Sequence, residues 1–279
     1  MTKIVADTTA CLSPEVISRY QIPIVPQVIN FGNESFQEGI EIDSPTFMRR
    51  LRSSSELPKT AAPMPENFEK IFTELVPTGE TIICIHPSAD VSGTVRSATI
   101  AASDFPDADI RIIDTRTIAG PLGTLVVLAA MWAETNCDAD QICTQIDQMI
   151  SRSRIFFLVE TLDYLARGGR IGGASALVGT LLQIKPILVF KDGKVDQYER
   201  ERTYKRAIQR LKQLVITQID HEGSGYPTIF HADSEAVANQ LAEDLKVALG
   251  VKEIPISFMP PAIVTHAGPG TIGVGFFQP

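Results

Sequence analysis

Cysteine is scarce in this sequence, and the cysteines present form no motif. The 279 residues contain four of them, and no two have the spacing C-x-x-C: Cys11, Cys84, Cys137 and Cys143. This scatter argues against a zinc site and against thioredoxin-like chemistry. We expect reduced thiols and a cytoplasmic location, because disulfides persist mainly in oxidising compartments.

An excess of positive charge is missing too, and so is any long apolar run. The formal net charge of -8 opposes binding to nucleic acid, whose phosphates attract basic surfaces. The most hydrophobic stretch, residues 122–132, is far shorter than the ~20 residues that span a bilayer. Residues 1–10 hold no apolar segment of signal-peptide length. We therefore predict no nucleic-acid partner and no stable membrane insertion.

Familiar catalytic and metal-binding motifs are also missing. The sequence has neither a G-x-S-x-G elbow nor a P-loop, so we assign no catalytic residue. Three histidines have no metal-like spacing to Asp, Glu or Cys, and we interpret them as structural or surface residues: His86, His221 and His231. We therefore predict no metal site and no cofactor.

One glycine motif is present but lacks its usual context. Residues 268–273, GPGTIG, fit the pattern G-x-G-x-x-G. The dinucleotide-binding fingerprint needs a helix and an acidic residue after the glycines, and only residues 274–279 follow here. We predict instead that Gly268 and Gly270 shape a tight loop beside a ligand or beside the other domain.

Strand-like and helix-like segments alternate through the first half of the chain. Short apolar strands are expected at residues 3–6, 22–31, 80–86 and 110–114, with helices between them, and the second of these strands is broken by Pro23 and Pro26. This alternation predicts an α/β domain with a doubly wound parallel sheet.

The pattern changes after residue 154. Asp192-Gly193 lies between two apolar runs and signals a hairpin, whereas later strands are joined through helices. We predict a second, α+β domain with a mixed sheet, and we place the two domains at residues 1–153 and 154–279.

The least ordinary stretch runs from Thr161 to Leu188. Two glycine pairs, Gly168-Gly169 and Gly172-Gly173, would each cost about 1 kcal/mol per residue inside a helix. They predict a break at which the backbone turns tightly or is approached closely. Residues 174–182 are small and apolar and predict a helix, which Lys185-Pro186 would end.

Three segments place candidate ligand-binding groups at the ends of strands or the starts of helices. Asp7 and Thr8 follow the first strand, at the edge of an α/β sheet where ligands bind. The loop that ends at Gly120 follows another strand. Ser92-Gly93-Thr94 opens a helix whose free N–H groups suit an anion, although an ordinary helix cap explains the same residues.

Five ordered motifs resemble those of a known family. LDYLARGGRI…LLQIKPIL is accompanied by DTTACL, KTAAP, VSGTVRSA and HAGPGTIG, which together span nearly the whole chain. This set resembles the DegV family, bacterial proteins that bind a fatty acid. The resemblance implies a carrier whose apolar tunnel holds the acyl chain, without catalysis by the protein itself.

The resemblance also implies the residues that bind the fatty-acid carboxylate. These are Thr60, in a loop that reads TSQP in many members, and Ser92 of the SGT segment, joined by Gly93 and Thr94. His266 becomes a pocket residue near the carboxylate. Here the loop reads Thr60-Ala61-Ala62-Pro63, so one possible hydroxyl donor is lost at Ala61.

The resemblance further implies a partner enzyme. In the family, arginines matching Arg170 and Arg202 dock a fatty acid kinase, which converts the bound acid to an acyl-phosphate for lipid synthesis. An arginine rim suits the anionic phosphates that a kinase carries, although such charges are usually a solvated face. Two alternatives stay open: a hydrolase or acyltransferase with Ser92 as nucleophile and His266 as base, and a DNA-binding regulator, which the acidic composition disfavours.

Overall fold

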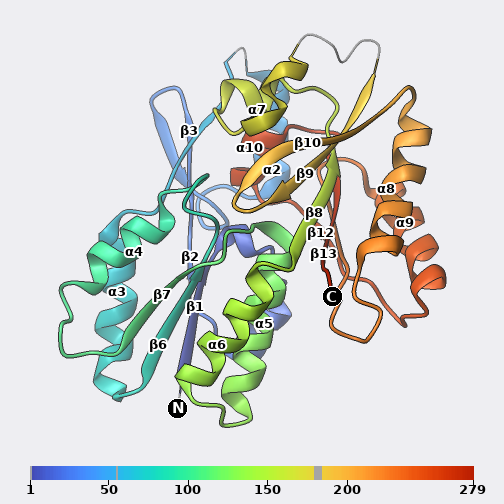
Figure 1. Ribbon diagram of the computed structural model, residues 1–279. Coiled ribbons are helices and arrows are strands. Elements are labelled where there is room, and N and C mark those ends of the chain that lie inside the picture. The colour runs from blue at the N-terminus through green and yellow to red at the C-terminus, as the bar shows by residue number, and fades with distance from the viewer. Residues whose placement is uncertain (1, 55, 179–183) are drawn as a thin grey trace.

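The computed structural model describes residues 2–54, 56–178 and 184–279, and within these ranges the strands form three sheets (Figure 1). The first sheet is parallel, with the strand order β2-β1-β6-β7. Its strands are β1 (Thr2–Asp7), β2 (Ile24–Val25), β6 (Thr81–His86) and β7 (Ile110–Asp114). The short helices η1 (Thr8–Ala10), α1 (Pro14–Tyr20) and η2 (Val76–Thr78) lie between them in the chain.

Helices cover both faces of this first sheet (Figure 1). On one face lie α3 (Pro65–Leu75) and α4 (Thr94–Ala102), and on the other α5 (Ala119–Glu134) and α6 (Ala139–Ile150). Residues of β6 alternate between the two cores: Ile82 and Cys84 pack with Phe68, and Ile83 and Ile85 pack with Leu122. Because side chains of a strand point to alternate faces, β6 is buried on both sides and is apolar throughout.

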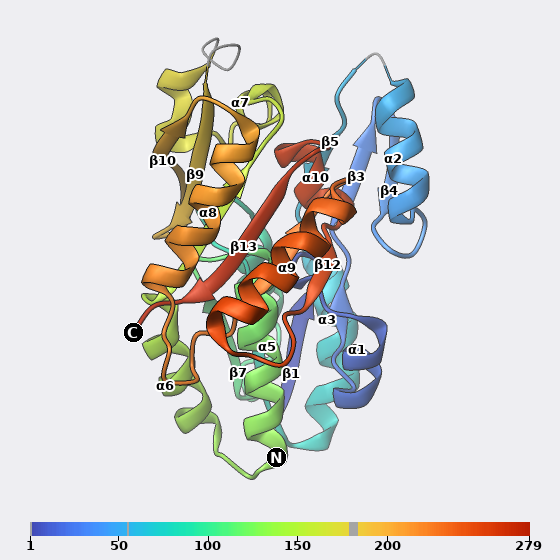
Figure 2. The ribbon, with the colours of Figure 1, turned by 90° about the vertical axis from the view of Figure 1, so that its right-hand side faces the viewer.

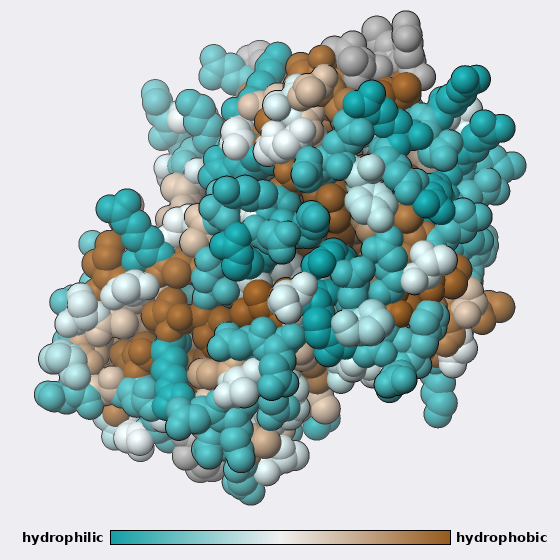
Figure 3. Space-filling model, viewed as in Figure 1, coloured by the Kyte–Doolittle hydropathy of each residue, from teal (hydrophilic) through white to brown (hydrophobic). Residues whose placement is uncertain are grey.

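The edge strand β7 is partly exposed along its whole length. Figure 3 shows apolar side chains gathered at the lower left of the view, over β7, with further apolar groups near the centre and right of a largely hydrophilic face. Arg111, the second residue of β7, forms ion pairs with Asp109 (3.0 Å) and Asp140 (2.5 Å). A charged side chain on an edge strand protects the sheet against pairing with another chain.

The second sheet is mixed, with the order β10-β9-β8-β13-β11-β12. Its strands are β8 (Ser153–Leu158), β9 (Lys185–Lys191), β10 (Lys194–Glu201), β11 (Thr228–His231), β12 (Ile256–Phe258) and β13 (Ile272–Phe277), and β11 and β12 are its parallel pair. Helices α8 (Tyr204–Gln218) and α9 (Glu235–Leu249) cover one face (Figure 2). A parallel first sheet and a mixed second sheet confirm the predicted fold class; the domain boundary near Ser153 stays a prediction.

A small third sheet was not predicted. It has the antiparallel order β4-β3-β5, from β3 (Val28–Phe31), β4 (Glu34–Gln37) and β5 (Lys59–Ala61), and it is accompanied by helix α2 (Ser44–Ser53). The strand predicted at residues 22–31, broken by Pro23 and Pro26, is divided between two sheets, with β2 in the first sheet and β3 in the third. Pro23 and Pro26 flank the two-residue β2, and since proline cannot donate to a ladder, the chain leaves the first sheet after Val25.

The glycine-rich stretch breaks the helix as predicted. Helix α7 (Asp163–Arg167) ends before Gly168, and Gly169 and Gly172 have left-handed φ angles of 69° and 52°. A Cβ at Gly172 would lie 2.0 Å from the carbonyl oxygen of Val195. The helix predicted for residues 174–182 is replaced by the 3-10 helix η3 (Gly172–Leu177), and Val178 is already non-helical, with ψ 127°. Residues 179–182 lie outside the described part of the chain.

Candidate functional site

A cavity of about 910 Å³, including its open mouth, lies where the three sheets meet. Most of its lining is apolar and comes from both halves of the chain: Ile118, Ala119, Ile155, Phe157, Leu165, Phe190, Val195, Phe230, Met259, Ala262 and Ile263. The arrangement suits a ligand with a long apolar part.

Polar groups of the lining gather where β5 approaches the loop before α4. They include Gln27, Thr60, Ser92, Arg170 and His266. The two segments are close, because a Cβ at Gly93 would lie 3.3 Å from the Cβ of Ala62. The cavity thus has an apolar body and a polar patch rich in hydrogen-bond donors.

Thr60 and His266 form one pair of this patch. The Thr60 Oγ1 lies 2.7 Å from His266 Nε2. Burial, assisted by the charge of Arg170, lowers the pKa of His266 to about 4. The other ring nitrogen, Nδ1, is buried and unpaired within the described residues. With its proton on Nε2, a neutral imidazole donates to Thr60 and leaves the Thr60 hydroxyl hydrogen free, while Nδ1 keeps a lone pair without a donor among the described residues.

Both residues lie on elements that the sequence did not predict. Thr60 is the middle residue of β5 and pairs with Ile29 of β3, instead of lying on a loop. His266 lies on helix α10 (Pro261–Ala267), instead of on a loop. Each element is shorter than the span over which apolar periodicity can be recognised.

Ser92 lies just before α4, and Gly93 rather than Ser92 caps that helix. The Ser92 Oγ lies 2.8 Å from Thr94 Oγ1 and accepts from the Thr94 N–H at 3.3 Å. Thr94 is fully buried behind Ser92. Gly93 leaves room for the close approach of Ala62.

Arg170 joins the two halves beside the cavity. Its Nε donates to the carbonyl oxygen of Val91 at 3.1 Å, and its Nη1 donates to that of Gly168 at 2.7 Å. The guanidinium is therefore held between the loop before α4 and the glycine-rich stretch. Arg202, the second predicted docking residue, is exposed at the end of β10 and does not line the cavity.

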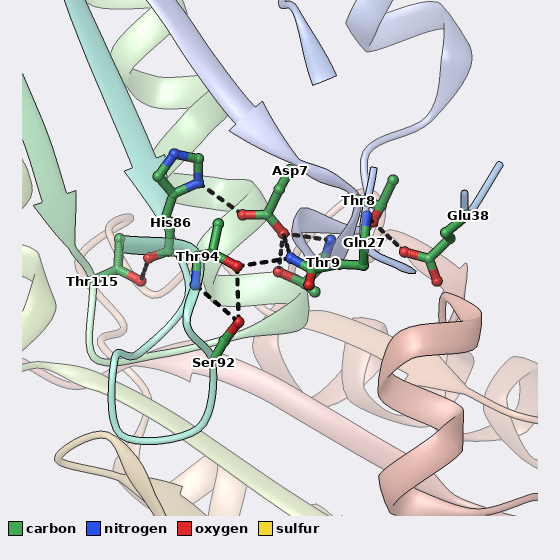
Figure 4. Close-up of polar contacts among 9 residues, drawn as sticks. All are labelled: Asp7, Thr8, Thr9, Gln27, Glu38, His86, Ser92, Thr94 and Thr115. Carbon is green, nitrogen blue, oxygen red and sulfur yellow. Dashed lines mark hydrogen bonds and ion pairs between the residues drawn. The ribbon is translucent and has the colours of Figure 1, made fainter. Parts of the chain in front are cut away.

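A buried polar network, which the sequence did not reveal, supports this patch (Figure 4). Asp7 accepts from Gln27 Nε2 at 3.1 Å and contacts His86 Nδ1 at 2.8 Å. Thr8 donates to Glu38, whose second oxygen accepts from the Ala262 N–H at 2.6 Å. Burial raises the pKa of Glu38 to about 7.

Several predicted residues lie outside the cavity lining. Asp7 and Thr8 do not line the cavity but bond to Gln27, which does. Ala61 lies between the lining residues Thr60 and Ala62 and does not itself line the cavity. Gly120 belongs to α5, where a Cβ would lie 2.0 Å from Thr228 Oγ1.

The two glycines of the GPGTIG motif also lie outside the lining. Gly268 and Gly270 have φ angles of 82° and 75°, and a Cβ on them would meet Tyr164 and Glu160 respectively. They shape the tight loop that was predicted, while the neighbouring Thr271 contacts the cavity.

The part of the chain that the structure describes has neither a cluster of metal-binding side chains nor a membrane-spanning helix. No group of three or more His, Cys, Asp or Glu side chains could hold a metal ion. None of the helices formed by residues 2–54, 56–178 and 184–279 has the length and apolar character needed to cross a membrane.

Known proteins resemble this chain along its whole length. A family model described as "Uncharacterised protein, DegV family" matches residues 1–278. A DegV domain-containing protein of Clostridium acetobutylicum is 34% identical, over 99% of this chain and 97% of the relative. One of Halalkalibacterium halodurans is also 34% identical, over 99% of each chain.

Solved structures of fatty-acid-binding proteins have the same fold as this chain. A fatty-acid-binding DegV family protein of Thermus thermophilus superposes with a TM-score of 0.92 at 28% identity, over 100% of this chain and 99% of the other. A stearic-acid-binding protein of Eubacterium ventriosum superposes with a TM-score of 0.91 at 25% identity, over 100% of this chain and 98% of the other. DegV of Bacillus subtilis, a fatty acid binding protein, gives 0.90 at 30% identity, over 99% of each chain. With a family match over nearly all of its residues and relatives above 30% identity, this chain belongs to the DegV family.

Proposed function

We propose that this protein binds a long-chain fatty acid, with the acyl chain against the apolar lining and the carboxylate at Thr60, Ser92 and Arg170, while His266 holds the Thr60 hydroxyl in place. The observation that carries the proposal is the cavity itself, whose apolar body ends in a cluster of hydrogen-bond donors. Fatty-acid binding by structural relatives that match the whole chain supports it further.

The acyl chain supplies most of the affinity. Burial of one methylene is worth about 0.8 kcal/mol, so roughly fifteen methylenes offer about 12 kcal/mol before the cost of association. The polar patch then fixes the orientation of the ligand. Arg170 supplies the positive charge, because the pKa of His266, lowered to about 4, leaves the imidazole neutral near pH 7. Charge-assisted hydrogen bonds are roughly twice as strong as neutral ones.

The departure from the family motif at Ala61 leaves this proposal intact. Thr60 and Ala62 line the cavity, whereas Ala61 does not. A hydroxyl at position 61 would therefore face away from the head group. Ala62, which stands where the TSQP loop has glutamine, has only a Cβ and lies close to Gly93.

The finer proposal is that the protein presents the bound carboxylate to a fatty acid kinase in the cytoplasm, without performing chemistry itself. Arg170 at the cavity and the exposed Arg202 would guide the anionic phosphates of the partner. Arg202→Ala separates docking from binding: fatty-acid affinity is expected to persist while kinase-dependent acyl phosphorylation falls. Unchanged phosphorylation would remove Arg202 from the docking surface.

A hydrolase or acyltransferase that uses Ser92 is less consistent with the site. His266 Nε2 bonds to Thr60, and the Ser92 hydroxyl bonds to Thr94. Neither contact pairs a nucleophile with its base.

Mass spectrometry of an organic extract of the purified protein tests these alternatives. We expect a free fatty acid of C16–C18 length in stoichiometric amount, and about tenfold weaker rebinding of palmitate by Ser92→Ala, since a hydrogen bond to a charged group is worth about 1.5–3 kcal/mol. An acyl chain esterified to Ser92 would favour the enzyme. No lipid, and no uptake of added palmitate, would contradict the carrier.

A further inference from the structure

A continuous chain of hydrogen bonds runs from the buried Asp7 to Ser92 at the cavity (Figure 4). Gln27 Nε2 donates to Asp7 Oδ1 at 3.1 Å and to Thr94 Oγ1 at 2.9 Å. Thr94 Oγ1 in turn lies 2.8 Å from Ser92 Oγ. Asp7 is held by the N–H and hydroxyl of Thr9, at 3.0 and 2.5 Å, and by His86.

The chemistry of these groups fixes the direction of the first links. Asp7 Oδ1 accepts from the Thr9 N–H, and the Gln27 atom that faces the same oxygen is the amide nitrogen. The same nitrogen contacts Thr94, so Thr94 Oγ1 accepts from it. The orientation of the Gln27 amide is thus set by Asp7.

The direction of the last link follows. Thr94 is fully buried, and its hydroxyl hydrogen needs a protein acceptor. Of the two side chains that contact Thr94 Oγ1 in the described part of the chain, Gln27 donates, so the hydrogen goes to Ser92 Oγ. Ser92 Oγ also accepts from the Thr94 N–H. Both of its lone pairs are therefore engaged, and its own hydrogen is free to point into the cavity.

We propose that Gln27 is a positioning residue that fixes the Ser92 hydroxyl as a donor and so selects a carboxylate over an alcohol head group. This inference rests on the proposed fatty-acid site. A carboxylate has only acceptor positions and takes the Ser92 hydrogen, whereas an alcohol also carries a hydrogen that Ser92 cannot accept. Without Gln27, the Thr94 and Ser92 hydroxyls can turn, and Ser92 can accept as well as donate.

The test compares palmitate with 1-hexadecanol, which has the same chain length and a neutral head group. Gln27→Met keeps the length of the side chain but removes the amide. We expect palmitate to bind about tenfold more weakly to this variant, while hexadecanol binding changes by less than about twofold. In a Ser92→Ala background, Gln27→Met is expected to have no further effect on the ratio of the two dissociation constants.

A second pair of variants keeps the test decisive should Gln27→Met fail to fold. Thr94→Val breaks the chain beyond Gln27 with a side chain of the same shape, and Thr94→Ser retains the hydroxyl. We expect Thr94→Val to lower the selectivity for palmitate and Thr94→Ser to restore most of it.

The possible outcomes distinguish failure of this inference from failure of the proposed fatty-acid binding. Three results would overturn the inference: an equal loss of affinity for both lipids in Gln27→Met, an unchanged ratio of their dissociation constants, or an effect of Gln27→Met that persists in the Ser92→Ala background. Any of them would show that Gln27 acts through the shape of the pocket, and the proposed fatty-acid carrier would be unaffected. Failure of the wild-type protein to bind either lipid would overturn the proposed function and this inference with it.

Discussion

At the scale of single residues, His266 is a weak base because it is buried and faces Arg170. Its pKa of about 4 in the folded state lies below the ordinary value of 6.5, so the unfolded chain binds a proton more readily. This group therefore contributes stability that is present above about pH 6.5 and is lost as the pH falls toward 4.

His266→Gln tests this assignment. Glutamine can still bond to Thr60 but does not titrate. We expect the free energy of unfolding of the wild-type protein, relative to His266→Gln, to fall by about 2 kcal/mol between pH 7 and pH 5. Urea denaturation at a series of pH values measures the difference, and parallel pH profiles for the two proteins would contradict it.

Gly168 packs closely against the imidazole of His266. A Cβ at this position would lie 2.2 Å from His266 Nδ1 and 2.9 Å from the carbonyl oxygen of Tyr164, although its φ of -76° suits any residue. Gly168→Ala is therefore expected to destabilise the fold by about 1–3 kcal/mol through overpacking. The loss should shrink when His266→Ala is combined with it; full additivity would mean that the ring is not the obstacle.

Sequence patterns reveal such residues unevenly. The glycine breaks were predicted from the local sequence, whereas Thr60 and Ser92 were proposed through the resemblance to the DegV family. Gln27 and Glu38 were not predicted, because their partners are distant in sequence: Thr94 lies 67 residues from Gln27, and Ala262 lies 224 residues from Glu38. No local spacing encodes contacts of that range.

At the scale of elements, Glu38 ties the turn after β4 to helix α10, which carries His266. Burial is the largest cause of its raised pKa, which is about 7, and the nearby Asp7 adds to it. A carboxyl whose folded pKa is raised contributes stability that is present below its ordinary value of 4.5 and is lost as the pH rises through about 7.

Glu38→Gln removes this titration while it keeps an oxygen for the Ala262 N–H. We expect Glu38→Gln to gain about 2 kcal/mol of unfolding free energy, relative to the wild-type protein, between pH 5 and pH 8. The pH dependence of the unfolding free energy has the opposite sign to that for His266, so the two variants serve as controls for each other. A gain at low pH instead would contradict the assignment.

The elements around Glu38 are also those that sequence patterns did not reveal. The two inner strands of the first sheet, β1 and β6, were predicted from their apolar runs, since both are buried between layers of helices. In contrast, β5 spans Lys59–Ala61 and α10 spans Pro261–Ala267, which are too short for a strand or helix period to emerge. These short elements are held by tertiary contacts, and both carry residues of the site.

At the scale of the whole molecule, the core does not divide where the sequence pattern changes. Ile29, Phe31 and Phe47 of the small third sheet and α2 belong to one buried cluster with Phe157, Leu188 and Met259 of the second half. The cavity lies within this shared core. Sequence patterns predicted two sheets in succession, but not that residues 28–61 would pack on the later one.

This shared core predicts that residues 1–153 do not fold completely when expressed alone. Without the second half, Ile29 and Phe47, both fully buried in the intact chain, would be exposed to solvent. Exposed apolar clusters bind the dye ANS and leave side chains without fixed packing. We expect strong ANS fluorescence from this fragment, and its loss when residues 154–279 are co-expressed and the two pieces associate. A dye-free fragment 1–153 with dispersed NMR signals would instead establish it as an independent domain, and the fatty-acid cavity would then be an interface between two preformed bodies.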